Sequence, residues 1–171
     1  MRVFRSHGIR VSAAMAGSVL ILALCGHASA QSYKGKFLTA DQSGVAPNTD
    51  PNLINPWGIS FTSTGPFWVA NNNSGTSTIY DSNGVPNALV VTIPSASGSG
   101  QGTPTGTVAN STTGFTVSKN GHSGPALFLF DSEDGVITGW NPNVDATNAV
   151  IAVDNSAAGA VYKGMELANN G

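Results

Sequence analysis

The chain contains two stretches that align with each other without a gap when the sequence is shifted by sixty residues. Trp68 then falls on Phe128, and Tyr80 falls on Trp140. A period of this kind indicates that both stretches form the same structural unit. Such units bury their apolar faces by stacking on one another, so the repeat constrains the fold more than any other feature of the sequence.

Each copy divides into four short runs rich in β-branched and aromatic residues, separated by turn-forming residues. We expect strands at 57–61, 67–70, 77–80 and 89–93, and again at 106–109, 127–130, 136–140 and 150–153. Residues 109–124 are a polar, glycine-rich insertion, and a third copy opens at 162–165. Sustained helical periodicity is absent after residue 30, so the sequence predicts an all-β fold.

Four antiparallel strands that recur along a chain are typical of the blades of a β-propeller. A sandwich of about seven strands is the alternative, but it gives no reason for one unit to copy another. Residues 56–171 hold two blades and the start of a third, about two and a half blades, whereas propellers close with about four to eight. We therefore expect this chain to be the N-terminal part of a protein of roughly 300 residues or more, prone to self-association in isolation.

The first thirty residues have the features of a cleaved secretory signal peptide. Three arginines precede a mostly apolar stretch at 11–25, and Ala28-Ser29-Ala30 offers a cleavage site of small residues. Cys25 leaves open a second interpretation, a lipoprotein signal. Both predict export to the periplasm, the cell surface or the extracellular space. Residues 31–55 form an N-terminal segment in which 37–39 is a candidate strand for closing the ring.

Without the leader, the chain has no arginine and no cysteine, and four lysines face nine carboxylates, a net charge of −5. An acidic chain without arginine cannot neutralise a nucleic-acid backbone, so we expect no nucleic-acid partner. The lack of cysteine excludes disulfides and thiol chemistry from this part. It also contains no stretch long enough to span a membrane.

Polar side chains gather in the turns of both copies. Because alternate turns of an up-and-down sheet lie at opposite ends, turns 71–75 and 131–135 share an end with connections 94–103 and 154–160. The candidate binding residues at this end are Asn55, Asn71, Asn72, Asn73, Asp131, Glu133 and Asp134. Asn and Asp also favour turns for local conformational reasons, which is the competing interpretation.

Catalytic residues are not evident in the sequence. His122 lies in the insertion and is expected to be a solvated loop residue, and Ser123 beside it lacks the surroundings of a nucleophile. Residues 131–135, Asp-Ser-Glu-Asp-Gly, could begin a calcium site, but their spacing does not fit an EF-hand. We expect Trp57, Trp68 and Tyr80 to pack between blades.

The opening Pro-x-Gly motifs at 56–61 and 104–109 resemble NHL repeats. The blocks at 41–47, 49–53 and 55–59, together with those at 65–70 and 160–164, are similar to an uncharacterised family of secreted bacterial NHL-like β-propellers. This resemblance implies a six-bladed ring and supplies no activity and no catalytic residues.

The sequence as a whole predicts an exported, non-enzymatic scaffold that binds a protein or glycan partner as well as the remaining blades. The alternative is a metal-dependent hydrolase or lactonase, as found on other six-bladed propellers, with a divalent ion in the channel. No cofactor is expected, and Ca²⁺ is compatible with the full-length protein.

Overall fold

The computed structural model describes residues 32–168, and the chain divides into two units between Gly35 and Lys36. The expected leader at 1–30 lies outside the described residues. The second unit contains all the strands of the described part, and its helical content is one 3₁₀ turn, Ser156–Ala158. The all-β prediction is confirmed. Among the described residues, no helix is long and apolar enough to cross a membrane.

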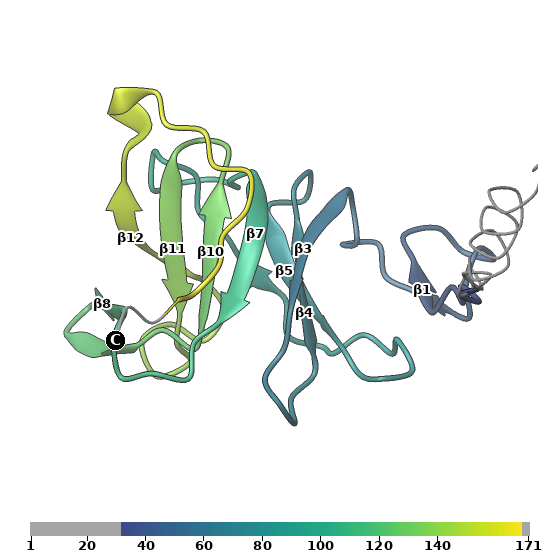
Figure 1. The fold of residues 1–171 in the computed structure, drawn as a ribbon. Coiled ribbons are helices and arrows are strands. Elements are labelled where there is room, and N and C mark those ends of the chain that lie inside the picture. The colour runs from purple at the N-terminus through teal and green to yellow at the C-terminus, as the bar shows by residue number, and fades with distance from the viewer. Residues whose placement is uncertain (1–31, 169–171) are drawn as a thin grey trace, which may run out of the picture. The chain divides into compact units, whose positions relative to one another are not determined.

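Two four-stranded antiparallel sheets form the body of this unit (Figure 1). Sheet 1 consists of β3 (Pro56–Ser60), β4 (Phe67–Asn71), β5 (Thr76–Tyr80) and β6 (Val91–Thr92). Sheet 2 consists of β7 (Pro104–Ala109), β10 (Phe128–Ser132), β11 (Val136–Trp140) and β12 (Val150–Asp154). Each predicted strand is present, with ends shifted by a few residues. The described residues do not form a closed ring.

A hairpin lies between β7 and β10 along the chain, in the stretch expected to be a polar, glycine-rich insertion. It consists of β8 (Thr116–Lys119) and β9 (His122–Pro125). Asn120 and Gly121 link the strands with φ of 51° and 83°. Positive φ at both central residues is what a two-residue type I′ hairpin turn requires. His122 is exposed as expected, but it lies in a strand rather than in a loop.

The N-terminal part of the unit forms a small parallel pair, β1 (Thr39–Ala40) with β2 (Asn48–Thr49). The Thr39 hydroxyl donates to the carbonyl of Gly84, and the Asn48 amide donates to the carbonyl of Asn83 at 3.0 Å. These bonds tie the pair to the loop between β5 and β6. The expected role of residues 37–39 in closing a ring involves segments outside the described residues and stays a prediction.

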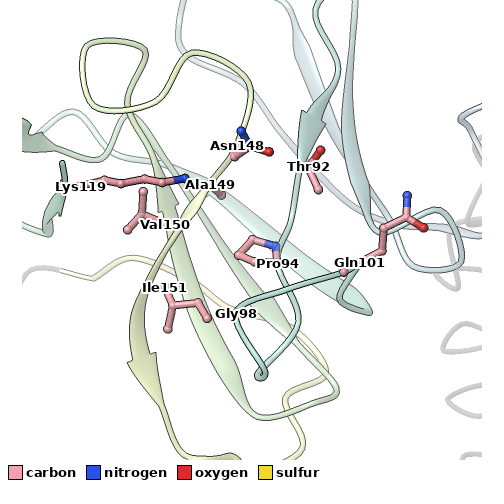
Figure 2. Close-up of a pocket in the computed structure, with 10 residues that line it drawn as sticks. Thr92, Pro94, Gly98, Gln101, Lys119, Asn148, Ala149, Val150 and Ile151 are labelled. Carbon is pink, nitrogen blue, oxygen red and sulfur yellow. The ribbon is translucent and has the colours of Figure 1, made fainter.

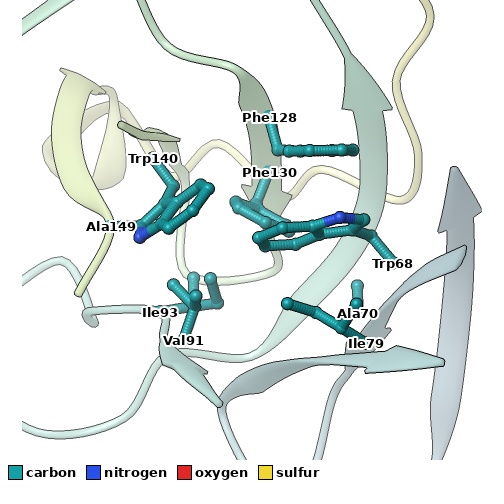
Figure 3. Close-up of a cluster of buried hydrophobic side chains, with 9 residues drawn as sticks. All are labelled: Trp68, Ala70, Ile79, Val91, Ile93, Phe128, Phe130, Trp140 and Ala149. Carbon is teal, nitrogen blue, oxygen red and sulfur yellow. The ribbon is translucent and has the colours of Figure 1, made fainter. Parts of the chain in front are cut away.

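The main core lies between the two sheets (Figure 3). Trp68 and Phe128 stack with ring centroids 4.0 Å apart, and the Trp140 ring lies 4.8 Å from that of Trp68. The core residues are Trp68, Ala70, Ile79 and Val91 from sheet 1 with Ile93 just after β6, and Phe128, Phe130 and Trp140 from sheet 2 with Ala149 just before β12. Trp68 therefore packs between the sheets, as the sequence predicts.

The strand pairing corrects the register of the repeat. Phe67 pairs with Tyr80 in sheet 1, and Phe128 pairs with Trp140 in sheet 2, so Phe67 rather than Trp68 corresponds to Phe128. The shift is therefore 61 residues before the turn and 60 after it, because the second turn is one residue shorter. A one-residue shift moves every side chain of a strand to the other face of its sheet.

The first strands of the two sheets approach closely because a glycine faces the contact. A Cβ atom on Gly58 of β3 would lie 2.6 Å from the carbonyl oxygen of Thr105 in β7. The same contact recurs one step along the chain, where a Cβ atom on Gly106 would lie 2.7 Å from the amide nitrogen of Met165. The segment at 162–166 thus lies against β7 as β7 lies against β3 (Figure 1).

Candidate functional site

The predicted binding residues gather at one end of the two sheets, where the turns meet the connections between sheets. The side-chain amide of Asn72 donates to the Thr103 carbonyl at 3.2 Å and to Glu133 Oε2 at 3.0 Å. The backbone amide of Glu133 also donates to Thr103, at 3.0 Å, and that of Ala96 donates to Asp134 Oδ2 at 2.8 Å. The two turns and the connection at 94–103 therefore share an end, as the sequence predicts.

Asn55 joins this end from the residue just before β3. Its φ is 53°, a left-handed conformation that asparagine tolerates better than most residues. Its side-chain amide donates to Asn73 Oδ1 at 3.0 Å, and its carbonyl accepts from the Asn72 backbone amide at 3.0 Å. Asn55, Asn72 and Asn73 therefore form one hydrogen-bonded group.

Asn71 and Asp131 differ from the other candidates because both are buried. Asn71 is 0% exposed and donates to Thr78 Oγ1 at 2.8 Å. The register of the strands places Ser132 at the position of Asn71, and Asp131 at the position of Ala70. The shift of sixty residues would match Asn71 with Asp131, but the register excludes this match, and the two side chains point to opposite faces.

Asp131 is a buried carboxylate with three protein donors. It is 1% exposed and accepts from Thr105 Oγ1 and from the Gly164 amide, each at 3.0 Å, and from the Gly106 amide. A buried charge is tolerated only when such donors surround it. Because Gly106 lies in β7 and Gly164 in the following segment, Asp131 fastens that segment to sheet 2.

Glu133 links the predicted binding residues to Lys163 and Trp57, a contact that the sequence did not reveal. Its carboxylate pairs with Lys163, and the Lys163 ammonium lies 5.4 Å from the centroid of the Trp57 ring. Lys163, followed by Asn72, holds the pKa of Glu133 below its usual range. The start of β3, the turn after β10 and the segment after β12 therefore meet around Lys163.

The three carboxylates of 131–135 serve different protein donors. Asp131 bonds to β7 and to the following segment, Glu133 bonds to Asn72 and Lys163, and Asp134 bonds to the connection at Ala96. Among the described residues, no three His, Cys, Asp or Glu side chains are arranged to hold a metal ion. The carboxylates of this turn thus do not converge on a common point.

A hollow of about 240 Å³ lies beside the Lys163 contact, along the first strands of the sheets. Its lining includes Trp57, Ile59, Thr107, Lys163 and the three glycines 58, 106 and 164. Trp57 is 47% exposed, so the expectation that it packs between sheets is wrong. One signal in the sequence could have revealed this: Trp57 occupies the position at which the second copy has Thr105, so the repeat does not require an aromatic residue there.

Tyr80 is buried as expected, but it packs on the face of sheet 1 that points away from sheet 2. Its hydroxyl donates to Asp50 Oδ2 at 2.7 Å and lies 2.8 Å from Thr78 Oγ1. Burial raises the pKa of this hydroxyl well above its ordinary value. Tyr80 thereby connects sheet 1 to the N-terminal segment.

A larger cleft, of about 460 Å³, opens at the outer edge of the sheets (Figure 2). The glycine-rich connection with Pro94 and Gln101 forms one wall, and β12 with Val150 and Ile151 forms the other. The cation that reaches the cleft, Lys119, is already paired with Asp145 at 2.7 Å. The cleft therefore offers apolar walls and amide groups, with its charge neutralised.

The comparisons with known proteins identify relatives in a virus. The chain is 36% identical over 141 residues to the uncharacterized protein L690 of Acanthamoeba polyphaga mimivirus, a match that covers 81% of this chain and 37% of that protein. It is 30% identical over 140 residues to the uncharacterized protein R648 of the same virus, covering 81% of this chain and 34% of that protein. This chain thus spans about a third of the length of these relatives.

No family model and no solved structure matches the chain. The expected resemblance to a family of secreted bacterial NHL-like propellers is therefore wrong, since the relatives found are viral proteins and no such family matches. The blocks at 41–47, 49–53 and 55–59 were short and contained many turn residues, which recur in unrelated β proteins.

Proposed function

We propose that this chain is part of an exported β-propeller that acts as a non-enzymatic binding scaffold. Its partner, a protein or a glycan, binds at the end of the sheets where Trp57, Lys163 and Glu133 meet. The observation that carries this proposal is the half-exposed indole ring of Trp57, which lines a hollow instead of packing in the core. Exposed aromatic rings beside polar groups are typical of recognition surfaces.

The arrangement of the sheets supports the propeller. Two sheets with the same strand order stack face to face, and a glycine brings the first strand of each against the next segment of the chain. A propeller repeats this step around an axis, with the first strands innermost. In this proposal further sheets complete the ring, and the hollow beside Trp57 lies at the central channel.

The chemistry of the site supports binding rather than catalysis. Asn72, Asp131 and Glu133 are held by protein partners, and Asp134 is held through Oδ2 while its buried Oδ1 has no protein partner. A general base needs a group that can reach the substrate proton. Nothing in the described residues favours the alternative, a metal-dependent hydrolase or lactonase.

The experiment is to screen the purified protein on a glycan array and against candidate protein partners, together with Trp57→Ala and Phe115→Ala. Phe115 is a matched control because it is also about half exposed and lies on the hairpin side of sheet 2. We expect Trp57→Ala to lose binding and Phe115→Ala to retain it. Equal binding by both variants would remove the proposed site. A stoichiometric divalent metal together with lactone hydrolysis would support the hydrolase instead.

A further inference from the structure

Three glycines contribute backbone to the lining of the hollow beside Trp57. Gly58, Gly106 and Gly164 lie along it, and none of them contributes a side chain. β3 and β7 are the first strands of their sheets and, in the described part, each pairs with one neighbouring strand. The amides of Gly106 and Gly164 already donate to Asp131, so a ligand would bond to other backbone groups along the second edges of these strands.

Trp57, the aromatic residue that lines the hollow, lies at an irregularity in the pairing of β3 with β4. The register between β3 and β4 shifts between Pro56 and Gly58, so Trp57 is not part of the regular alternation. A bulge of this kind redirects a side chain. The indole thereby lines the hollow, next to the hydroxyl-bearing Thr107 and the apolar Ile59.

Lys163 is the cation among the residues that line the hollow, and its present partner is replaceable. The side chains of Lys163 and Glu133 are 58% and 29% exposed. Ion pairs between exposed side chains contribute little, because water and counterions compete with them. Glu133 would keep its hydrogen bond from Asn72 after losing Lys163. Glu166 also lines the hollow, where its carboxylate accepts from the backbone amide of Leu167 at 3.1 Å.

We infer that this hollow binds an acidic sugar: a pyranose ring lies on Trp57, and its carboxylate replaces Glu133 on Lys163. The inference rests on the proposed function and names the ligand class for the same site. A pyranose matches the hollow because it has an apolar C–H face for the indole and a rim of hydroxyl groups for the backbone along the strand edges. A charge-assisted hydrogen bond from Lys163 to the sugar carboxylate then discriminates acidic from neutral sugars.

The experiment compares a galacturonic-acid trisaccharide with its methyl ester, which has the same rings and no charge. We expect the free acid to bind at least about tenfold more tightly than the ester, because the charged hydrogen bond is lost in the ester. Titration calorimetry measures the affinities. The indole N–H resonance of Trp57, assigned by its absence in Trp57→Ala, should shift on binding.

Two variants and one control locate the effect. Lys163→Gln should make the acid and the ester bind equally, and Trp57→Ala should weaken both. Lys119→Gln removes a lysine on the outer edge and should change neither affinity. Circular dichroism and thermal unfolding should show that the exposed substitutions leave the fold intact.

The outcomes separate this inference from the proposed function. If the acid and the ester bind equally to the unaltered protein, or if Lys163→Gln keeps the preference, the acidic-sugar inference is wrong and glycan binding stands. If no saccharide binds but a protein partner does and Trp57→Ala abolishes that binding, the ligand class is wrong and the scaffold function stands. If Trp57→Ala changes the binding of no partner, both are wrong.

Discussion

Trp68 and Phe128 stack on each other from two different sheets, with ring centroids 4.0 Å apart and an interplanar angle of 18°. Trp68 therefore lies on the face of sheet 1 that points toward sheet 2, and Phe128 lies on the face of sheet 2 that points back. In a stack of like units, equivalent residues point in the same direction. The contact thus shows that these two residues are partners across an interface and not the same position of a repeat.

Trp68→Ala should lower the free energy of unfolding by about 3–5 kcal/mol, because it removes a large buried ring from both Phe128 and Trp140. Urea denaturation followed by circular dichroism measures the loss. Trp57→Ala is the matched control: Trp57 is half exposed, so we expect a change within about 0.5 kcal/mol. Equal losses in the two variants would contradict the assignment of Trp68 to the core.

The strands could be predicted because they depend on local patterns. Runs such as 67–70 and 136–140 are rich in β-branched and aromatic residues, and Gly75 and Gly135 mark the turns between them. The hairpin of β8 and β9 also has a local signal, Asn120-Gly121, which lies within a stretch rich in polar residues and glycine. The positions of the strands and of their turns could thus be predicted from the sequence, whereas the ends of the strands differ by a few residues.

The candidate site was predictable in its position but not in its contacts. Turn residues from both copies do meet at one end, as the alternation of strands requires. The one-residue difference in turn length could not be seen, and it decides whether a side chain such as Asp131 faces a neighbouring segment. The exposure of Trp57 likewise depends on a bulge in the pairing of β3 with β4, which appears only in the folded chain.

Asp131→Asn should loosen the segment at 162–165. The substitution places an amide group among the three donors that surround the carboxylate, so at least one buried donor loses its acceptor, at a cost of about 1–3 kcal/mol. Hydrogen exchange of the Gly164 amide should become faster. Asp81→Asn, which changes an exposed turn aspartate, should leave the exchange at Gly164 unchanged. If the Gly164 amide exchanges as slowly in Asp131→Asn as in the unaltered protein, Asp131 does not hold this segment in place.

Tyr80→Phe should destabilise the contact between sheet 1 and the N-terminal segment. The variant removes the donor that lies 2.7 Å from the buried carboxylate of Asp50, and an unpaired buried acceptor costs about 1–3 kcal/mol. Chemical denaturation at neutral pH measures the effect. Tyr162→Phe is the control, because its hydroxyl bonds to Asn155 at the exposed surface. A larger loss in Tyr162→Phe than in Tyr80→Phe would be inconsistent with the buried contact.

Alkaline pH should destabilise the protein through the same tyrosine. The pKa of Tyr80 is raised by burial above its ordinary value of 10.0, so the folded state holds a proton that the unfolded state releases. The contribution of the Tyr80 hydroxyl to the free energy of unfolding is therefore fully present below about pH 10 and is lost as pH rises further. Unfolding free energies at pH 8 and pH 11 should differ less for Tyr80→Phe than for the unaltered protein. An unchanged pH dependence would show that Tyr80 is not the group responsible.

Acid should weaken the contact between the hairpin and the loop before β12. The hydrogen bond from Lys119, the largest cause, holds the pKa of Asp145 at about 2, below its ordinary value of 3.8. A lowered pKa contributes stability that is present above about pH 4 and is lost as pH falls toward 2. Lys119→Met should therefore reduce the loss of unfolding free energy between pH 5 and pH 2, by about 0.5–1 kcal/mol for a partly exposed pair.

Part of this acid dependence should survive in Lys119→Met, because the backbone amides of Thr147 and Asn148 still donate to Asp145 at 3.1 and 3.0 Å. Lys36→Met removes the same charge at a position far in sequence from Asp145, so it controls for the change in net charge. We expect its pH profile to match that of the unaltered protein. If Lys36→Met and Lys119→Met flatten the profile equally, the effect comes from overall charge, and the pair at β8 does not stabilise the fold.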